Sequence, residues 1–473
     1  MTISTGASHT TDRSVIVIGL DCATPQLVFD AWRDDLPTIS ALMARGAYGE
    51  LESTIPAITV PAWSAMMTGM DPGQLGFYGF RNRADHSYDN MTIANGSDVR
   101  HPRVWNRLSA AGKRVAAIGV PQTYPVHPVN GEMVSCFLTP STKSQFTYPP
   151  GLRAEIDGWL DGDEFLVDVP NFRSDDKDRI LADIYRMTDQ HFTVCRRLLE
   201  RQRYDFFMMV EMGVDRMHHA FWQYMDRDHP KHAPGSRFRN AIHDYYVHVD
   251  GLIGDLLERV DSQTSVVVVS DHGARAMQGG VCINEWLIER GHLVLREYPS
   301  ETTPLERCEV DWSRTRAWAA GGYYARLNLN VEGREPQGII PADRYEEERD
   351  AMIAELATIT DPEGRPIGVR GHKPEDLYRS VTNVPPDLIV YFGDLEWRSV
   401  GSVGIGSVWT FENDTGPDEA NHAQHGIIVI ADPQRPAAGQ KLDGLQIYDV
   451  APTLLTMLGQ PIPDQVRGKV IEW

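Results

Sequence analysis

Short apolar segments rich in β-branched residues recur along this chain, and such segments are typical of buried strands in a parallel sheet. Residues 15–20 (VIVIGL), 204–211 (YDFFMMVE) and 265–270 (SVVVVS) are predicted to form three of these strands. Two more are predicted at residues 387–392 (DLIVYF) and 426–431 (GIIVIA). The pattern therefore predicts a sheet assembled from segments that lie far apart in the sequence.

Stretches with apolar residues at helical spacing lie between the predicted strands. Residues 36–45 follow this spacing and stop before Gly46, and residues 179–201 and 237–260 are longer amphipathic stretches. Strands that alternate with helices predict an α/β fold with a mostly parallel central sheet covered on both faces. In such folds ligands bind beyond the carboxyl ends of the strands.

Two segments, near residues 139–203 and 291–376, interrupt this alternation. The first is rich in Pro, Gly and Asp up to residue 175, and the second mixes Pro, Gly and charged residues around a possible strand at 323–330. We expect both to be insertions that cap the ligand-binding edge of the sheet. The predicted organisation is a flexible tail at 1–13 followed by a single catalytic α/β domain at 14–473.

Composition narrows the classes of function. The net charge of −21 over 473 residues argues against nucleic-acid tracking, which needs a basic surface. No apolar run reaches about 18 residues, so neither a transmembrane helix nor a membrane partner is expected. Five scattered cysteines without a secretory signal pattern predict reduced thiols and a cytoplasmic location. An anionic substrate would need a local positive charge, which bound metal ions supply.

Acidic residues follow three of the predicted strands. Asp21 and Asp271 come directly after their strands, and Asp215 follows the strand at 204–211. On a helical turn, Asp215 and His219 point the same way and could chelate one ion, although an Asp cap beside an exposed His fits the spacing equally. His272 adds an imidazole next to Asp271, on a turn that glycine at the following position makes tight. A metal site at the edge of the sheet is one reading of these residues.

The stretch at residues 54–69 (TIPAITVPAWSAMMTG) is the most unusual in the chain. Pro61 suits the first turn of a helix, which would place Thr59 or Val60 at the N-cap. Thr59 could be a plain helix cap. Alternatively, its hydroxyl lies where helix N–H groups favour a phosphate, and a metal ion could activate it as a nucleophile.

The order of these motifs resembles the alkaline phosphatase superfamily. A strand followed by Asp, then Thr-x-Pro, Asp-x-x-x-His, Ser-Asp-His-Gly and a late His is most similar to the type I phosphodiesterase/nucleotide pyrophosphatase branch and to microbial predicted phosphohydrolases or phosphomutases. The similarity runs over nearly the whole chain. It includes four further stretches, at residues 104–109 (VWNRLS), 119–125 (GVPQTYP), 280–287 (GVCINEWL) and 447–455 (IYDVAPTLL).

The resemblance implies an αβα sandwich with two metal sites, of zinc or alternatively manganese. One site would use Asp21, Asp271, His272 and the Thr59 oxygen, and the other would use Asp215, His219 and His422. His425 competes with His422, but His422 has the family's spacing of four residues before the glycine that opens a strand. The other histidines, including His229, His232, His243 and His248, match no family position.

The implied activity is hydrolysis of a small phosphorylated substrate, at a phosphodiester or pyrophosphate bond, through a phosphothreonine intermediate on Thr59. Phosphomonoesterase, phosphomutase and phosphonate hydrolase activity at the same site are the alternatives, and a non-catalytic binding protein is a more distant one. Leu75-Gly76 stands where relatives often carry His-Gly, and Val-Pro-Ala-Trp after Thr59 differs from the sulfatase pattern. Arg81 and Arg275 could contact phosphate or form ordinary surface ion pairs.

Overall fold

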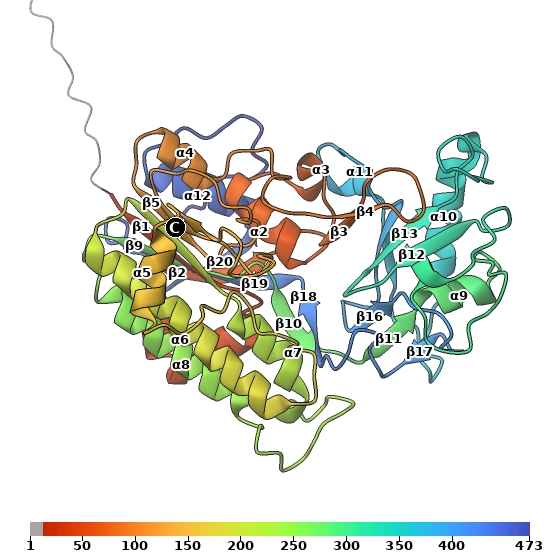
Figure 1. Ribbon diagram of the computed structural model, residues 1–473, viewed down its shortest axis with the longest axis horizontal. Helices are drawn as coiled ribbons and strands as arrows, with labels where there is room; N and C mark the ends of the chain where they lie inside the picture. The colour runs from red at the N-terminus through yellow and green to blue at the C-terminus, as the bar shows by residue number, and fades with distance from the viewer. Residues whose placement is uncertain (1–12) are drawn as a thin grey trace, which may run out of the picture.

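A nine-stranded sheet forms the centre of the larger of two lobes (Figure 1). The structure is a computed structural model that describes residues 13–473, so the tail predicted at 1–13 lies almost entirely outside the described part. In spatial order the strands are β20 (Gln440–Gln446), β2 (Ala47–Glu52), β19 (His425–Ala431), β9 (Ser265–Val269), β1 (Val15–Leu20), β8 (Phe206–Glu211), β5 (Val115–Ile118), β6 (Gly131–Val134) and β7 (Thr147–Tyr148).

The middle of this sheet is parallel, and its register aligns the strand ends. Strand β1 lies between β8 and β9, pairing Val15 with both Phe206 and Ser265. All residues of these three strands are buried, as expected for apolar strands covered on both faces. Strand β19 runs antiparallel to both β9 and β2, and β7 runs antiparallel to β6, so the sheet is mixed toward both edges.

Helices cover both faces of the large sheet, which confirms the predicted α/β sandwich (Figure 1). One face carries α1 (Pro37–Arg45), α5 (Leu152–Trp159), α6 (Lys177–Arg201), α7 (Gly213–Met225) and α8 (Ala241–Leu257). The other face carries α2 (Thr59–Thr68), α4 (Val104–Ala110) and α12 (Val450–Met457). Among the residues that the structure describes, none of the helices is both long and apolar enough to cross a bilayer.

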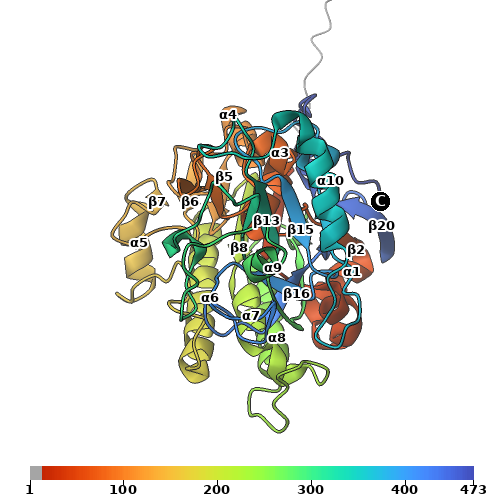
Figure 2. The same cartoon turned by 90° about the vertical axis from the view of Figure 1, so that its right-hand side faces the viewer.

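A smaller lobe, which faces the viewer in Figure 2, has its own apolar core, formed by buried residues from the segment 281–403. Its first sheet has the order β12 (Ala317–Ala320), β13 (Ala325–Leu329), β15 (Leu388–Tyr391) and β14 (Arg370–His372). Its second sheet has the order β16 (Trp397–Val400), β11 (Gly279–Cys282) and β17 (Trp409–Thr410), and the lobe also contains α9 (Ile283–Glu289) and α10 (Tyr345–Leu356). The strand predicted at 387–392 thus belongs to this lobe and not to the central sheet.

A two-stranded sheet, β10 (Gly273–Ala276) with β18 (Ala420–Ala423), extends from the end of β9 toward the smaller lobe. Its antiparallel register pairs Ala274 with His422, so a residue late in the chain is placed near the carboxyl end of β9. Other short elements are β3 (Arg81–Arg83), β4 (Met91–Ile93), α3 (Pro72–Leu75) and α11 (Pro374–Leu377), together with the short helices η1 (Gln26–Ala31), η2 (Arg33–Asp35), η3 (Leu305–Arg307), η4 (Ala342–Arg344) and η5 (Ile447–Asp449).

Candidate active site

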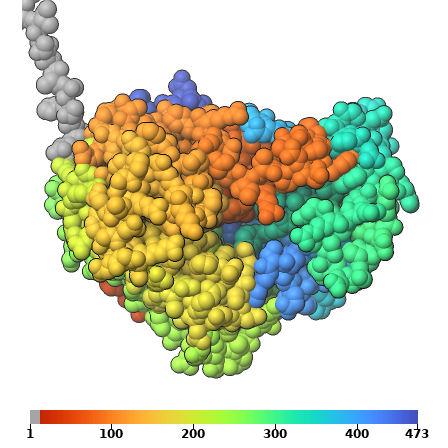
Figure 3. Space-filling model, viewed as in Figure 1, coloured from red at the N-terminus to blue at the C-terminus, as the bar shows by residue number. Residues whose placement is uncertain are grey.

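The predicted site residues lie together at the edge of the larger lobe that faces the smaller lobe (Figure 1). They come from five elements: the ends of β1 and β9, the first two turns of α7, the start of α2, and β18. Figure 3 shows that the surface of the molecule is hollowed between the two lobes. All of these residues are buried: Asp21, Thr59, Asp215, His219, Asp271, His272 and His422.

Thr59 is the first residue of α2. The N-cap is Ile58, in an extended conformation, and Ala62 N–H donates to its carbonyl over 3.0 Å. The prediction of an N-cap at Thr59 or Val60 is therefore wrong, because the helix begins one residue earlier, with Pro61 still in its first turn. Thr59 Oγ1 lies 3.3 Å from His272 Nε2.

Asp21, Asp271 and His272 form the first group of potential metal ligands. His272 Nε2 lies 3.1 Å from Asp271 Oδ2 and 3.8 Å from Asp21 Oδ1. Neither of these carboxylate oxygens has a hydrogen-bond partner among the described residues, although both are fully buried. Burial, together with repulsion from neighbouring carboxylates, raises the pKa of both carboxyl groups. Because unpaired buried carboxylates are costly, the group fits a bound cation.

Other atoms of this group are held by neighbours. Trp63, one turn after Thr59, donates its indole N–H to Asp21 Oδ2 over 2.7 Å. The backbone N–H of Cys22 donates to Asp271 Oδ1 over 3.2 Å, and Cys22 has a φ of 68°, which is unusual for a residue other than glycine. These contacts leave one oxygen of each carboxylate directed toward His272.

Asp215, His219 and His422 form the second group. Helix α7 places Asp215 and His219 one turn apart, with His219 Nε2 3.1 Å from Asp215 Oδ1. His422 Nε2 lies 3.9 Å from the same oxygen, whereas His425 is exposed at the start of β19. Burial lowers the pKa of His219, but the charges of Asp418 and Asp215 outweigh it and raise the pKa to about 9. Burial and the two neighbouring imidazoles hold the pKa of His422 well below its usual range.

The two groups adjoin each other. The His272 and His422 rings stack with their centroids 3.8 Å apart, and Thr59 lies against His272. Imidazole and carboxylate donors suit zinc and related divalent ions. Two neighbouring ions of this kind can assist displacement at phosphorus by acting on the attacking and the leaving oxygen.

Several buried polar residues around the site were not predicted from the sequence. Asp418 contacts His219 from 199 residues away, so local spacing does not reveal it, whereas Trp63 lies one helical turn after Thr59 and could have been suggested by spacing. Tyr323 stacks on His422 with a centroid distance of 4.1 Å. It comes from the segment predicted to be an insertion, where no motif distinguishes it from other tyrosines.

Arginines near the site form ion pairs. Arg216 is buried, donates to both oxygens of Asp168 over 2.8 and 2.9 Å, and also contacts Asp215. Arg275 pairs with Asp394 over 2.9 Å and with Glu396 over 2.7 Å. This geometry fits the interpretation of Arg275 as an ordinary ion-pair residue.

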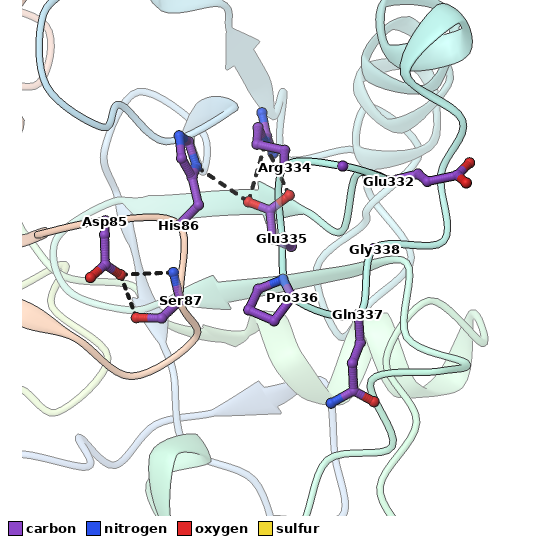
Figure 4. Close-up of a pocket in the computed structure, with 10 residues that line it drawn as sticks. Asp85, His86, Ser87, Glu332, Arg334, Glu335, Pro336, Gln337 and Gly338 are labelled. Carbon is purple, nitrogen blue, oxygen red and sulfur yellow. Dashed lines mark hydrogen bonds and ion pairs between the residues drawn. The ribbon is translucent and has the colours of Figure 1, made fainter.

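A separate surface depression of about 580 Å³ lies between residues 85–87 and 332–338 (Figure 4). Its main polar contacts converge on Glu335, which pairs with His86 over 3.5 Å and with Arg334 over 2.9 Å. None of the seven predicted site residues lines this depression. We interpret its charged residues as an ion-pair cluster that supports the smaller lobe.

Known proteins show the same fold. The phosphonoacetate hydrolase of Sinorhizobium meliloti, solved in complex with phosphonoacetate, is 16% identical, with a TM-score of 0.61 over 94% of this chain and 95% of that one. Human ectonucleotide pyrophosphatase/phosphodiesterase 5 is 14% identical, with a TM-score of 0.53 over 95% of this chain and 96% of that one. The inactive murine protein of the same name, in complex with AMP, is 13% identical, with a TM-score of 0.54 over 96% of each chain.

Sequence comparison identifies the family. A search of curated protein sequences found no match. The family model described as type I phosphodiesterase/nucleotide pyrophosphatase, however, matches residues 15–427, a range that contains all seven predicted site residues. This match covers most of the chain. The protein therefore belongs to the type I phosphodiesterase/nucleotide pyrophosphatase family of the alkaline phosphatase superfamily, and it is a hydrolase.

Proposed function

We propose that this hydrolase cleaves phosphodiester or pyrophosphate bonds of small phosphorylated substrates, with two divalent metal ions and Thr59 as the nucleophile. The observation that carries the proposal is the position of the Thr59 hydroxyl. It lies 3.3 Å from His272 Nε2, at the N-terminus of α2 and beside two groups of potential metal ligands. Because Ile58 is the N-cap of α2, the Thr59 hydroxyl does not cap this helix.

One ion would be held by Asp21, Asp271 and His272 with the Thr59 oxygen, and the other by Asp215, His219 and His422. When bound, such ions lower the pKa of an attacking hydroxyl or water and stabilise a departing oxygen. Zinc suits this mixture of imidazole and carboxylate donors, and manganese is the alternative. The two ions would also offset the three ligand carboxylates, so that an anion could approach a protein of net charge −21.

Thr59 would act in two steps. Its Oγ1 forms a bond to phosphorus as the bond to the leaving oxygen breaks, and the result is a phosphothreonine. A water molecule then attacks the same phosphorus and releases Thr59 together with the phosphorylated product. The N-terminus of α2 favours the negative charge on the phosphoryl oxygens throughout, because the first N–H groups of a helix lack partners within the helix.

The test compares Thr59→Ala with Thr59→Ser on bis-aryl phosphate in the presence of zinc or manganese. We expect Thr59→Ala to lower kcat by at least about 10³-fold, because the nucleophile is lost, and Thr59→Ser to retain a measurable part of the activity. Rapid acid quenching of the wild type should trap an aryl phosphoryl group on Thr59, with one equivalent of the aryl alcohol released. Full activity of Thr59→Ala would show that Thr59 is not the nucleophile.

Phosphonate hydrolysis is a second candidate for the same site. It is favoured by the similarity in fold to the phosphonoacetate hydrolase, whose TM-score of 0.61 is above the 0.53 of the human phosphodiesterase. Assays with phosphonoacetate, mono-aryl phosphate and aryl sulfate beside bis-aryl phosphate distinguish the candidates. The diester proposal expects the highest kcat/KM for bis-aryl phosphate, whereas a highest value for phosphonoacetate would favour the second candidate.

A further inference from the structure

Asp418 is a fully buried carboxylate that lies outside the two groups of potential metal ligands but contacts one of them. Its Oδ1 accepts a hydrogen bond from His219 Nδ1 over 2.7 Å, and no part of its side chain is exposed. The other nitrogen of the ring, Nε2, lies 3.1 Å from Asp215 Oδ1. The two nitrogens of His219 therefore face two different carboxylates.

The second oxygen of Asp418 collects contacts from three separate parts of the chain. Asp418 Oδ2 accepts from Tyr323 Oη over 3.2 Å and from Arg173 Nε over 3.0 Å. Arg398 Nη1 lies 3.5 Å from the same oxygen. Arg173 precedes α6, whereas Tyr323 and Arg398 belong to the smaller lobe. With both oxygens engaged from several directions, the carboxylate has little freedom to turn away from His219.

This geometry decides which nitrogen of His219 carries the proton in a metal-bound site. A carboxylate at 2.7 Å favours a proton on Nδ1, which leaves the lone pair of Nε2 directed toward Asp215. The carbonyl of Ala420 also lies 3.1 Å from Nδ1, but it is neutral and cannot supply the negative charge.

We propose that Asp418 is a positioning residue that holds His219 ready to bind the metal ion of the Asp215 group through Nε2. The inference rests on the proposed two-metal function and adds to it the residue that orients one ligand. It also connects the site to the smaller lobe, because the same carboxylate binds Tyr323 and Arg398.

The test compares Asp418→Asn with Asp414→Asn. Asp414 is a matched control because it lies 3.9 Å from the same Arg398 and accepts a hydrogen bond from Ser402, yet among the described residues it makes neither a hydrogen bond nor an ion pair with His219. Metal affinity is measured by titration of the metal-free proteins. We expect Asp418→Asn to lower the affinity for one of the two ions by about 10–100-fold and to leave the affinity for the other unchanged. Asp414→Asn should bind both ions as the wild type does.

Unchanged affinity for both ions in a folded Asp418→Asn protein would overturn the inference while leaving the proposed function intact. A wild type that binds no second ion would overturn both. If Asp418→Asn does not fold, histidine ¹⁵N spectra of the metal-loaded wild type decide the question, with His219→Asn used to assign the signal. We expect a protonated Nδ1 and a metal-bound Nε2, and binding through Nδ1 would overturn the inference.

Discussion

Each of the three imidazoles in the site has its Nδ1 next to an oxygen atom. His219 Nδ1 faces Asp418, His272 Nδ1 lies 3.1 Å from the carbonyl of Gly273, and His422 Nδ1 lies 2.9 Å from that of Ala57. In each ring this leaves Nε2 directed toward the carboxylates. Such contacts on the far side of a ring fix its tautomer and orientation. The residues that surround the candidate ligands therefore matter as much as the ligands themselves.

Trp63 holds Asp21 in the same manner, and its loss should be measurable. In Trp63→Phe, Asp21 Oδ2 loses its indole partner while it remains buried. A buried polar atom without a partner costs about 1–3 kcal/mol. We expect the free energy of unfolding, measured with urea on the metal-loaded protein, to fall by at least this amount.

Trp105→Phe is the matched control for Trp63→Phe. Trp105 is equally buried, but its indole N–H has no hydrogen-bond partner among the described residues. This variant loses ring volume without breaking a hydrogen bond, so its destabilisation should be the smaller of the two. Equal losses in the two variants would contradict the role assigned to Trp63.

At the scale of elements, the turn from β8 into α7 is built on Glu211. Its Oε1 accepts from the backbone N–H of Gly213 over 2.8 Å and from Thr188 of α6 over 3.1 Å. Its Oε2 lies 3.5 Å from His191 Nδ1, also on α6. A single buried carboxylate thus joins a strand, the helix that follows it and the helix that covers both. The position of Asp215 in the first turn of α7 depends on this arrangement.

The pair of His191 and Glu211 predicts a dependence of stability on pH. Burial lowers the pKa of His191, but the hydrogen bond and charge of Glu211 outweigh it, so the pKa is raised above 6.5. A group whose pKa is higher in the folded protein than in the unfolded chain stabilises the folded state. This stabilisation is complete below the pKa of the unfolded chain and is lost as the pH rises through the pKa of the folded protein. The free energy of unfolding, measured with urea, should therefore fall less between pH 6 and pH 9 for His191→Gln than for the wild type. An identical decrease in both proteins would refute this linkage.

The elements differ in how well local pattern predicted them. The predicted strands at 15–20, 204–211 and 265–270 agree with β1, β8 and β9 within two residues, because burial on both faces produces continuous apolar runs. The strand at 387–392 is present as β15 but pairs with β13 and β14 of the smaller lobe. An apolar run shows that a strand is buried, but it does not specify which strand is its neighbour.

At the scale of the whole molecule, the site gathers three buried carboxylates where the two lobes meet. Asp21 and Asp271 have raised pKa values because burial and repulsion from neighbouring carboxylates disfavour their charged forms. A bound cation removes this unfavourable charge, so metal binding and stability are linked. The same positive charge would attract an anionic substrate to the hollow between the lobes.

Metal removal should therefore lower the melting temperature. When the free metal concentration is about 100 times the dissociation constant, one bound ion adds about 2.7 kcal/mol to the free energy of unfolding. We expect a chelator to lower the Tm at neutral pH in calorimetry, and added zinc or manganese to restore it. In His272→Ala, which lacks one ligand, the chelator should lower the Tm by less than in the wild type. A wild-type Tm that does not respond to chelation would contradict a structural contribution of the ions.

Apolar runs located β1, β8, β9, β15 and β19, and helical spacing located α1, α6 and α8. The candidate site residues that follow these strands were also named from the sequence. Apolar periodicity and the spacing of Asp215 and His219 depend only on residues close together in the chain, so they can be recognised without a structure. Which atoms of the site come into contact follows instead from the folded chain. Asp418 is 199 residues from His219, and Tyr323 is 95 residues from Asp418. Contacts between residues so far apart in the sequence follow from strand pairing and from the packing of the two lobes, which local patterns do not encode.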